Sequence, residues 1–279
     1  MSYKTILVHV DKSRRVAERI KVAAGIAAAG DAHLIGAAMS GVSRFLFQNG
    51  GLENYDPYLS AHLVALRQRA HDALEQFELT AERLSVNSWE KRIADDEAGA
   101  GISLQARYSD LVVIGQTDPN EPSPAVPADF PEYVVMNAGK PVLIVPYAGE
   151  FKQVGNKVLI AWDASVEATR AVTGAIPLLK SAAKVDVLIF NPSAQPDTHG
   201  EQPGADIALF LARHGIKVEV GRQRTAGNVG EALLSTAIDL SADLIVMGGY
   251  GHSRFREVLL GGVTRTVLDT MTVPVLMAH

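Results

Sequence analysis

The sequence predicts an α/β fold made of two tandem, doubly wound domains, each with a five-stranded, mostly parallel sheet. The first observation behind this prediction is an internal repeat, since TILVHVDKS at 5–13 resembles KVLIAWDAS at 157–165, 152 residues later. Two further segments recur in the same order and 133 residues apart: DLVVIG at 110–115 as DLIVMG at 243–248, and PVLIV at 141–145 as PVLMA at 274–278. Three matching segments in one order indicate two copies of a single unit.

The second observation is the character of these segments, which are continuous apolar runs rather than alternating ones. Such runs are typical of strands in a parallel sheet that helices cover on both faces. The third observation is that helical and extended segments alternate within each copy. We expect Ser165 to cap a helix, because apolar residues recur after it at helical spacing. The other elements expected are second strands at 32–40 and 184–193, a third strand at 217–223, and helices over 165–181, 203–214 and 227–240.

The two domains are expected at residues 1–149 and 155–279, on either side of the polar, glycine-containing stretch AGEFKQVGN at 148–156. The two copies lie 152 residues apart at their first strands but 133 residues apart at the later segments, so the first copy carries 19 extra residues before DLVVIG. The extra length is assigned to residues 41–60, which hold four aromatic residues. This segment is interpreted as a lid, a dimer contact or an ordered surface insertion.

The bulk composition excludes several classes of protein. A net charge of −5 and a pI near 5.9 argue against a nucleic-acid-binding protein, and the absence of cysteine excludes disulfides and thiolate chemistry. No apolar run approaches the roughly 20 residues that a bilayer span requires. The N-terminus lacks the features of a signal peptide, so a cytoplasmic protein without a membrane partner is expected.

A candidate ligand site follows from the expected topology, because open α/β sheets bind ligands at the C-terminal ends of their strands, near the switch in strand order. In the second copy Asp163 ends the first strand, the loop from Asn191 follows the second, and Gly248 ends DLIVMG. A carboxylate there can accept from ribose hydroxyls or an adenine amine. Glycines permit the close approach of backbone N–H groups to phosphates.

The glycine-rich stretch GGYGHSRFREVLLGG at 248–262 is the candidate phosphate loop. We expect the following helix to open at Gly261, so that its free amides and dipole favour an anion by up to about 2 kcal/mol. The dinucleotide and P-loop fingerprints are both absent, so the spacing alone leaves a plain glycine-rich loop equally open. The predicted ligand-binding residues are Asp163, Asn191, Met247, Gly248, Gly251, His252, Arg254, Gly261, Gly262 and Thr264.

Two features of the second copy resemble the universal stress protein family. They are Asp163 at the end of the first strand and the motif G-x2-G-x9-G at Gly248, Gly251 and Gly261. The resemblance covers essentially the whole chain as two tandem domains. It implies a Rossmann-like, adenine nucleotide alpha hydrolase-like fold. It also implies an adenine nucleotide such as ATP as ligand, with or without Mg²⁺.

Carried over to this sequence, the resemblance implies that Asp163 and the Asn191 backbone contact the nucleoside. It assigns the glycines and Thr264 to the phosphates. ATP-binding members have Ser or Thr directly after the last glycine, whereas this chain has Gly262 there and loses one hydroxyl. Members commonly dimerise through the last strand, a contact that PVLIVPY and PVLMAH can satisfy within this chain, which leaves a homodimer open.

The first copy departs from this pattern over a stretch of equal length, 26 residues from glycine to proline in both copies. It keeps Asp11 and Gly115, but its loop contains five prolines, each of which lacks an N–H donor. Asp118, Ala128, Asp129 and Pro131 stand opposite Gly251, Gly261, Gly262 and Thr264. The first domain is therefore predicted not to bind nucleotide in this manner and to be structural or regulatory. A pocket for another ligand, lined by residues 41–60, is the alternative.

Other candidate sites carry less weight. The eight histidines lack paired ligand spacing, so no metal site is expected, and His9 is interpreted as a core residue. Asp95, Asp96 and Glu97 precede an expected helix, where acidic residues suit the dipole. The absence of a nucleophile elbow argues against nucleophilic catalysis. Any hydrolysis is expected to be slow, since no residue is evidently placed as a base to activate water.

The function predicted from the sequence is that of a stress-response protein binding an adenine nucleotide in its C-terminal domain. The alternative is a nucleotide-independent protein-interaction or scaffolding module of the same fold. An ATP-using ligase or sulfur-transfer enzyme would need a Ser-Gly-Gly-rich loop after the first strand, which VDKSRR and WDASVE do not provide.

Overall fold

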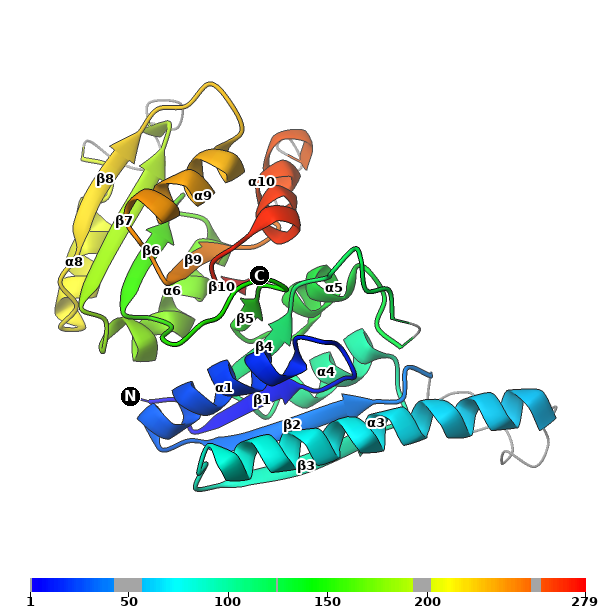
Figure 1. Ribbon diagram of the computed structural model, residues 1–279. Helices are drawn as coiled ribbons and strands as arrows, with labels where there is room; N and C mark the ends of the chain where they lie inside the picture. Colours follow the sequence, from blue (N-terminus) through cyan, green and yellow to red (C-terminus); the bar gives the residue numbers. More distant parts are fainter. Residues whose placement is uncertain (1, 43–56, 124, 193–201, 252–256) are drawn as a thin grey trace. The chain divides into compact units, whose positions relative to one another are not determined.

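The structure is a computed structural model, and it describes residues 2–42, 57–123, 125–192, 202–251 and 257–279 (Figure 1). Helices and strands alternate within each copy of the repeat, as the sequence predicts, and the chain divides into two compact units. We call Ser2–Lys140 the N-terminal unit and Pro141–His279 the C-terminal unit.

The N-terminal unit contains four parallel strands in the order β3-β2-β1-β4. The strands are β1 (Thr5–His9), β2 (His33–Met39), β3 (Trp89–Ala94) and β4 (Leu111–Gly115). The helices are α1 (Val16–Gly30), α3 (Pro57–Arg83), α4 (Ala98–Ala106) and α5 (Phe130–Asn137). Figure 1 shows α3 lying along β2 and β3, where Phe77 meets Trp89 edge to face with ring centroids 5.9 Å apart. β1 and β4 are almost wholly buried, which explains why their sequences are continuous apolar runs.

The C-terminal unit contains six strands in the order β8-β7-β6-β9-β10-β5. They are β5 (Val142–Val145), β6 (Lys157–Ala161), β7 (Lys184–Phe190), β8 (Glu219–Gln223), β9 (Leu244–Gly248) and β10 (Val275–Ala278). The helices are α6 (Val166–Leu179), α8 (Ala205–Arg213), α9 (Val229–Asp239) and α10 (Glu257–Thr270). Ser165 caps α6 as predicted, because its Oγ accepts from the Ala168 N–H at 3.0 Å.

The strand β5 pairs antiparallel with β10, with Leu143 opposite Leu276, whereas the neighbours β10 and β9 are parallel. This confirms the predicted contact between PVLIVPY and PVLMAH within one chain. Each copy of the repeat supplies five strands, β1–β5 and β6–β10, as the sequence predicts. β5 belongs to the same compact unit as its partner β10, so the units hold four and six strands. The domain limits 1–149 and 155–279 stay a prediction.

The extra length of the first copy lies mostly in a helix. α3 has 27 residues, whereas α8, which occupies the same place in the second copy, has 9. Of the predicted insertion at 41–60, residues 43–56 lie outside the described residues, and α3 begins at Pro57. The structure therefore assigns most of the difference to a longer helix that covers β2 and β3.

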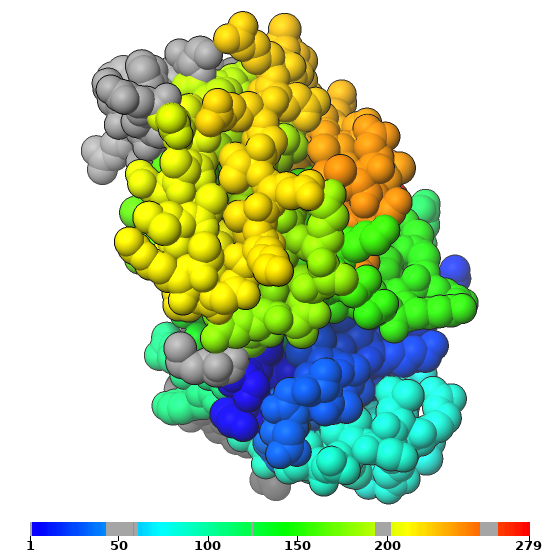
Figure 2. All heavy atoms as spheres, turned by 90° about the vertical axis from the view of Figure 1, so that its left-hand side faces the viewer, coloured from blue at the N-terminus to red at the C-terminus, as the bar shows by residue number. Residues whose placement is uncertain are grey.

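The strand β8 forms one edge of the C-terminal sheet, and most of its residues are exposed. The yellow atoms of Figure 2 show this flank of the unit, formed by α8 and β8. Edge strands are commonly protected from pairing by charged side chains, and Glu219 and Arg222 provide such charges here. Within the described residues, no helix combines the length and the apolar character needed to cross a membrane.

Candidate functional site

The candidate site lies where the strand order of the C-terminal unit reverses. β6 is flanked by β7 on one side and by β9 on the other, and all three strands are parallel. Their C-terminal ends therefore meet at one edge of the sheet, which is the edge where open α/β sheets bind ligands. Asp163 follows β6, Asn191 follows β7, and Gly248 ends β9.

Asp163 presents an accessible carboxylate at this edge. Its Oδ1 accepts from the Ser165 N–H at 3.0 Å and from the Ser165 hydroxyl at 2.6 Å. The side chain is exposed, and its Oδ2 accepts no hydrogen bond within the described part of the chain. The short turn thus holds the carboxylate in place through one oxygen and leaves the other for a hydrogen-bond donor in a ligand.

Backbone strain is concentrated around the same edge. Six described residues other than glycine have positive φ, and three of them follow helices, where the left-handed conformation is common. The other three are Ala164 (φ 60°), Asn191 (φ 48°) and Tyr250 (φ 53°), which follow the ends of β6, β7 and β9 within three residues. Such conformations cost about 1–2 kcal/mol each and are often found at functional sites. The N-terminal counterparts Lys12, Ser40 and Thr117 do not have positive φ.

Asn191 connects two loops through its side chain. Its Oδ1 accepts from the Thr225 N–H at 2.9 Å and its Nδ2 donates to the Thr225 carbonyl at 3.0 Å. The Asn191 backbone N–H donates to the Gln223 carbonyl at 2.9 Å. The loops after β7 and β8 are therefore held together. The Asn191 backbone N–H, which the prediction assigned to the nucleoside, already donates to Gln223.

The predicted glycines differ in what their surroundings require. A Cβ on Gly248 would lie 2.6 Å from the Ala168 nitrogen, so close packing on the first turn of α6 requires glycine there. A Cβ on Gly251 would be 3.5 Å from Glu167 Oε2, and one on Gly262 would meet nothing within 4 Å among the described residues. Packing therefore explains Gly248 but neither of the other two. Met247 is buried within β9.

The start of the helix after the glycine-rich stretch corrects a prediction. α10 begins at Glu257, so Gly261 and Gly262 lie inside it and not at its first residue. The physical reason is that Glu, Val, Leu and Leu precede the glycines, and most of these residues favour a helix more than Gly does. The free N–H groups at the start of α10 therefore belong to residues 257–260.

Thr264 joins the glycine-rich loop to α10. The Tyr250 N–H donates to the Thr264 hydroxyl at 3.4 Å, and Thr264 is buried. The structure thus brings the start of the loop and Thr264 together, as the prediction required. The predicted residues His252 and Arg254 lie outside the described residues.

The equivalent edge of the N-terminal unit is filled by an arginine. Asp11 Oδ1 accepts from Arg19 Nη2 at 2.7 Å, as well as from the Ser13 N–H and hydroxyl. Burial opposes ionisation of Asp11, but Arg19 and Ser13 outweigh it and hold the pKa of this carboxyl below its usual range. A Cβ on Gly115 would lie 2.4 Å from Arg19 Nη1, so this glycine makes room for the guanidinium.

A loop also covers this edge of the N-terminal unit. The Glu121 carboxylate accepts from the Arg14 N–H at 3.0 and 3.2 Å. A Cβ on Gly41 would lie 2.7 Å from Ala125 Cα, which means that the loop after β4 packs directly on the end of β2. Asp11 is thus surrounded by groups of its own unit, whereas Asp163 is exposed.

Sequence reasoning missed Arg19, although the repeat contained the signal. The 152-residue offset that aligns Asp11 with Asp163 places Arg19 opposite Ala171, which is fully buried. The same offset aligns Arg15 with Glu167. In these two pairs, an arginine of the first copy stands opposite an alanine or an acidic residue of the second. Both positions lie at the start of a helix beside the site, so the pairs indicate that the two copies use this edge differently.

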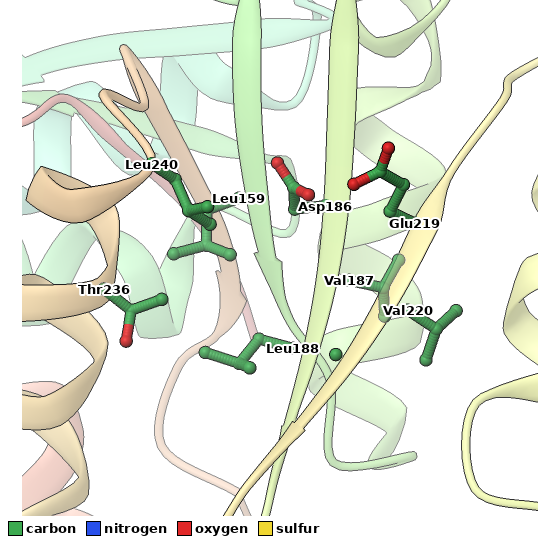
Figure 3. A pocket seen from close by; sticks show the side chains of 9 residues that line it. Leu159, Asp186, Val187, Leu188, Glu219, Val220, Thr236 and Leu240 are labelled. Carbon is green, nitrogen blue, oxygen red and sulfur yellow. The ribbon is translucent and has the colours of Figure 1, made fainter.

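A hollow of about 250 Å³ lies elsewhere in the C-terminal unit (Figure 3). Its lining is mostly aliphatic and includes Leu159, Leu188 and Leu240, with Asp186 and Glu219 together at one end. Lys184 Nζ lies 3.2 Å from Asp186 and 3.1 Å from Glu219, so both carboxylates have a counter-charge. The lining residues that belong to strands lie in the first halves and middles of β6, β7 and β8, and Thr236 and Leu240 come from α9 and its C-terminal end. The hollow is therefore separate from the site at the C-terminal ends of the strands.

Comparisons with known proteins agree with the repeat and the fold. A universal stress protein of Synechocystis sp. is 28% identical over 148 residues, which are 52% of this chain and 49% of that protein. The chain thus spans about half the length of this curated relative. The crystal structure of a universal stress protein from Archaeoglobus fulgidus has a TM-score of 0.71 at 15% identity, covering 98% of this chain and 97% of its own.

A second solved structure, a functionally unknown protein from Pseudomonas aeruginosa, has a TM-score of 0.59 at 19% identity and covers 98% of this chain and 92% of its own. The model of the universal stress protein family matches twice, over residues 2–146 and 155–279. The predicted tandem arrangement and α/β fold are confirmed. The chain belongs to the universal stress protein family, with one family domain in each half.

Proposed function

We propose that the C-terminal domain binds an adenine nucleotide at the edge formed by the ends of β6, β7 and β9. The observation that carries the proposal is the exposed carboxylate of Asp163, whose Oδ2 has no donor within the described residues. The strained residues after the same three strands support it, because such conformations persist only where the surrounding structure holds them.

Each group has a chemical role in this proposal. Asp163 Oδ2 accepts a hydrogen bond from a ribose hydroxyl or from the adenine amine. The Gly249 N–H donates to the Ala278 carbonyl, and the Tyr250 N–H donates to the Thr264 hydroxyl. The N–H assigned to a phosphate is therefore that of Gly251, which follows the left-handed Tyr250. The loop after β7 offers the nucleoside a carbonyl at Asn191, since the Asn191 N–H is engaged by Gln223.

The N-terminal domain has a structural or regulatory role in this proposal. Arg19 donates one hydrogen bond to the Asp11 carboxylate, at Oδ1, whereas a ligand would donate to Oδ2 of the Asp163 carboxylate. The Glu121 carboxylate occupies the Arg14 N–H at the start of the next helix. A nucleotide would have to displace both internal contacts, so one nucleotide per chain is the expected stoichiometry.

The test is a calorimetric titration of the full chain with ATP, ADP and AMP, repeated with the Asp163→Asn and Gly251→Asp variants. Asp163→Asn keeps the shape but replaces Oδ2 with a donor, so the affinity should fall about tenfold, the equivalent of about 1.4 kcal/mol. Gly251→Asp copies Asp118 of the N-terminal unit and adds a negative charge near Glu167. Its new Cβ has room at 3.5 Å, so the fold should persist while binding weakens.

Asp206→Asn is the matched control, because Asp206 lies in the first turn of α8 and is exposed. It should leave nucleotide affinity unchanged. Absence of binding by the unaltered chain at millimolar nucleotide would refute the proposal. The remaining candidate would then be the protein-interaction module of the same fold.

A further inference from the structure

The aliphatic hollow beside β6, β7 and β8 lies over a glycine of the edge strand. Gly221 of β8 does not have a positive φ, so the backbone does not require glycine there. A Cβ on Gly221 would lie 3.4 Å from Leu188 Cδ1 and 3.9 Å from the Val187 carbonyl oxygen, and both are ordinary contacts. The hollow exists because a position that could carry a side chain carries none.

Polar side chains bound the hollow at two ends. Toward the end of β8, the Thr236 hydroxyl donates to Gln223 Oε1 at 3.0 Å. Toward the start of the strands, the carboxylates of Asp186 and Glu219 lie close together, as Figure 3 shows, and both pair with Lys184. The space between these ends is bounded mainly by aliphatic side chains. Apolar walls with a few polar groups at fixed places are typical of a small-molecule site.

The acidic end of the hollow is suited to a cation. One ammonium group, that of Lys184, serves two carboxylates among the described residues, and the Asp186 side chain is only 16% exposed. The C-terminal end of α9 also borders the hollow, and a helix C-terminus carries a partial negative charge. The exposed lysines near the strand starts, Lys157 and Lys217, are not among the lining residues. A second positive charge at this end would therefore be stabilised.

The N-terminal unit supplies such a charge from its own chain at the equivalent place. The strand registers align Arg92 of β3 with Gly221 of β8, and Glu90 with Glu219. Arg92 Nε donates to Glu90 Oε1 at 2.6 Å. In the C-terminal unit the glutamate is kept, but glycine replaces the arginine. A ligand can therefore supply in the second copy the cation that Arg92 supplies in the first.

We propose that this hollow binds a small aliphatic amine in its protonated form, at a site distinct from the proposed nucleotide site. The ammonium group donates to the two carboxylates at the acidic end, and the hydrocarbon chain lies against Leu159, Leu188 and Leu240. The volume of about 250 Å³ equals that of about eight water molecules at ~30 Å³ each, which suits an amine of about six carbon atoms. Burial of the chain contributes affinity, and the carboxylates select for positive charge.

The experiment titrates the full chain at neutral pH with hexylamine, hexan-1-ol and hexanoate, which share a chain length and differ in charge. The methyl resonances of Leu159, Leu188 and Leu240 in leucine-labelled protein report binding at the hollow itself. Hexylamine should shift them with a Kd in the millimolar range, as expected for a ligand of about seven non-hydrogen atoms. Hexan-1-ol should bind about tenfold more weakly, because it forms no ion pair with the carboxylates, and hexanoate should not bind.

Three variants test the residues of the hollow. Gly221→Arg restores the arrangement of the N-terminal unit, so it should abolish hexylamine binding without lowering the free energy of unfolding. Glu219→Gln should weaken binding about threefold, since Glu219 is 74% exposed and solvent screens its charge. Glu231→Gln is the matched control, because Glu231 is an exposed glutamate in the first turn of α9, and it should leave the affinity unchanged.

The probes on the unaltered chain decide the outcome without any variant. Equal affinity for hexylamine and hexan-1-ol would overturn the assignment to an amine. Absence of leucine methyl shifts with hexylamine would overturn the site, and so would hexylamine binding that persists in Gly221→Arg. The measurement needs no nucleotide, so its result stands apart from that of the nucleotide titrations.

Discussion

Replacing Gly248 with alanine tests whether this glycine is required by packing. The added Cβ would lie 2.6 Å from the Ala168 nitrogen and 2.9 Å from the Glu167 carbonyl carbon. Ordinary contacts of a Cβ begin near 3.4 Å, so β9 and the first turn of α6 would have to separate by almost 1 Å. Two of the three nearest atoms belong to the backbone, which cannot rotate away as a flexible side chain can.

The expected cost follows from this geometry. Overpacking a well-packed region typically costs about 1–3 kcal/mol, and a collision with backbone belongs at the upper end. We therefore expect Gly248→Ala to lower the free energy of unfolding by about 3 kcal/mol. For a unit of this size, each kcal/mol lowers Tm by about 2–4 °C.

The assay is urea and thermal unfolding of the full chain without nucleotide, followed by circular dichroism, with Gly262→Ala as the contrasting variant. Gly262 lies inside α10 and nothing approaches its Cβ position within 4 Å, so alanine there should stabilise by about 0.5–1 kcal/mol. If Gly248→Ala were as stable as the unaltered chain, the packing argument would be refuted. Gly248 would then be explained by ligand binding alone.

Two further predictions concern the N-terminal unit. Arg19→Ala copies Ala171 and leaves the Asp11 carboxylate with Ser13 alone, so the free energy of unfolding measured in urea should fall by about 3 kcal/mol. Adding Asp11→Asn should recover part of that loss. If the effects of the two substitutions were simply additive, the pairing would be contradicted. Burial lowers the pKa of His9 from 6.5 to about 4, and the nearby Asp11 opposes this shift in part. In the unfolded chain His9 therefore takes up a proton below pH 6.5, whereas in the folded chain it does so only near pH 4. Stability should fall by about 3 kcal/mol between pH 7 and pH 4, and His9→Gln should lose this part of the pH dependence in unfolding measured across that range.

The sequence predicted the fold well because the repeat and the strand character are local properties. The ends of β1, β4, β6 and β9 fall within one or two residues of the predicted segments, since continuous runs of Val, Ile and Leu have few alternatives to a buried strand. The length of α3 was not predicted, because part of it continues from a mixed segment whose pattern favours neither helix nor loop. The start of α10 was missed because two glycines resembled a helix boundary, although they lie inside the helix.

The relative positions of the candidate site residues could be predicted from the sequence, but their contacts could not. Topology alone places Asp163, Asn191 and Gly248 at one edge of the sheet. Gly248 turned out to contact the first turn of α6, and the Asn191 side chain turned out to join two loops. Such contacts depend on which side chains reach across from other elements, and a single sequence does not contain that information.

The two copies show how one turn can serve opposite purposes. In both, a serine two residues after the aspartate donates its N–H and hydroxyl to Oδ1, so Asp-x-Ser is a stable turn without any ligand. What differs is the residue that faces this carboxylate from the following helix. Arg19 reaches Asp11 and neutralises it, whereas Ala171 is too short to reach Asp163. One position in the second turn of this helix therefore accounts for part of the difference between the two edges, because Arg19 gives Asp11 a counter-charge from this helix and Ala171 gives Asp163 none.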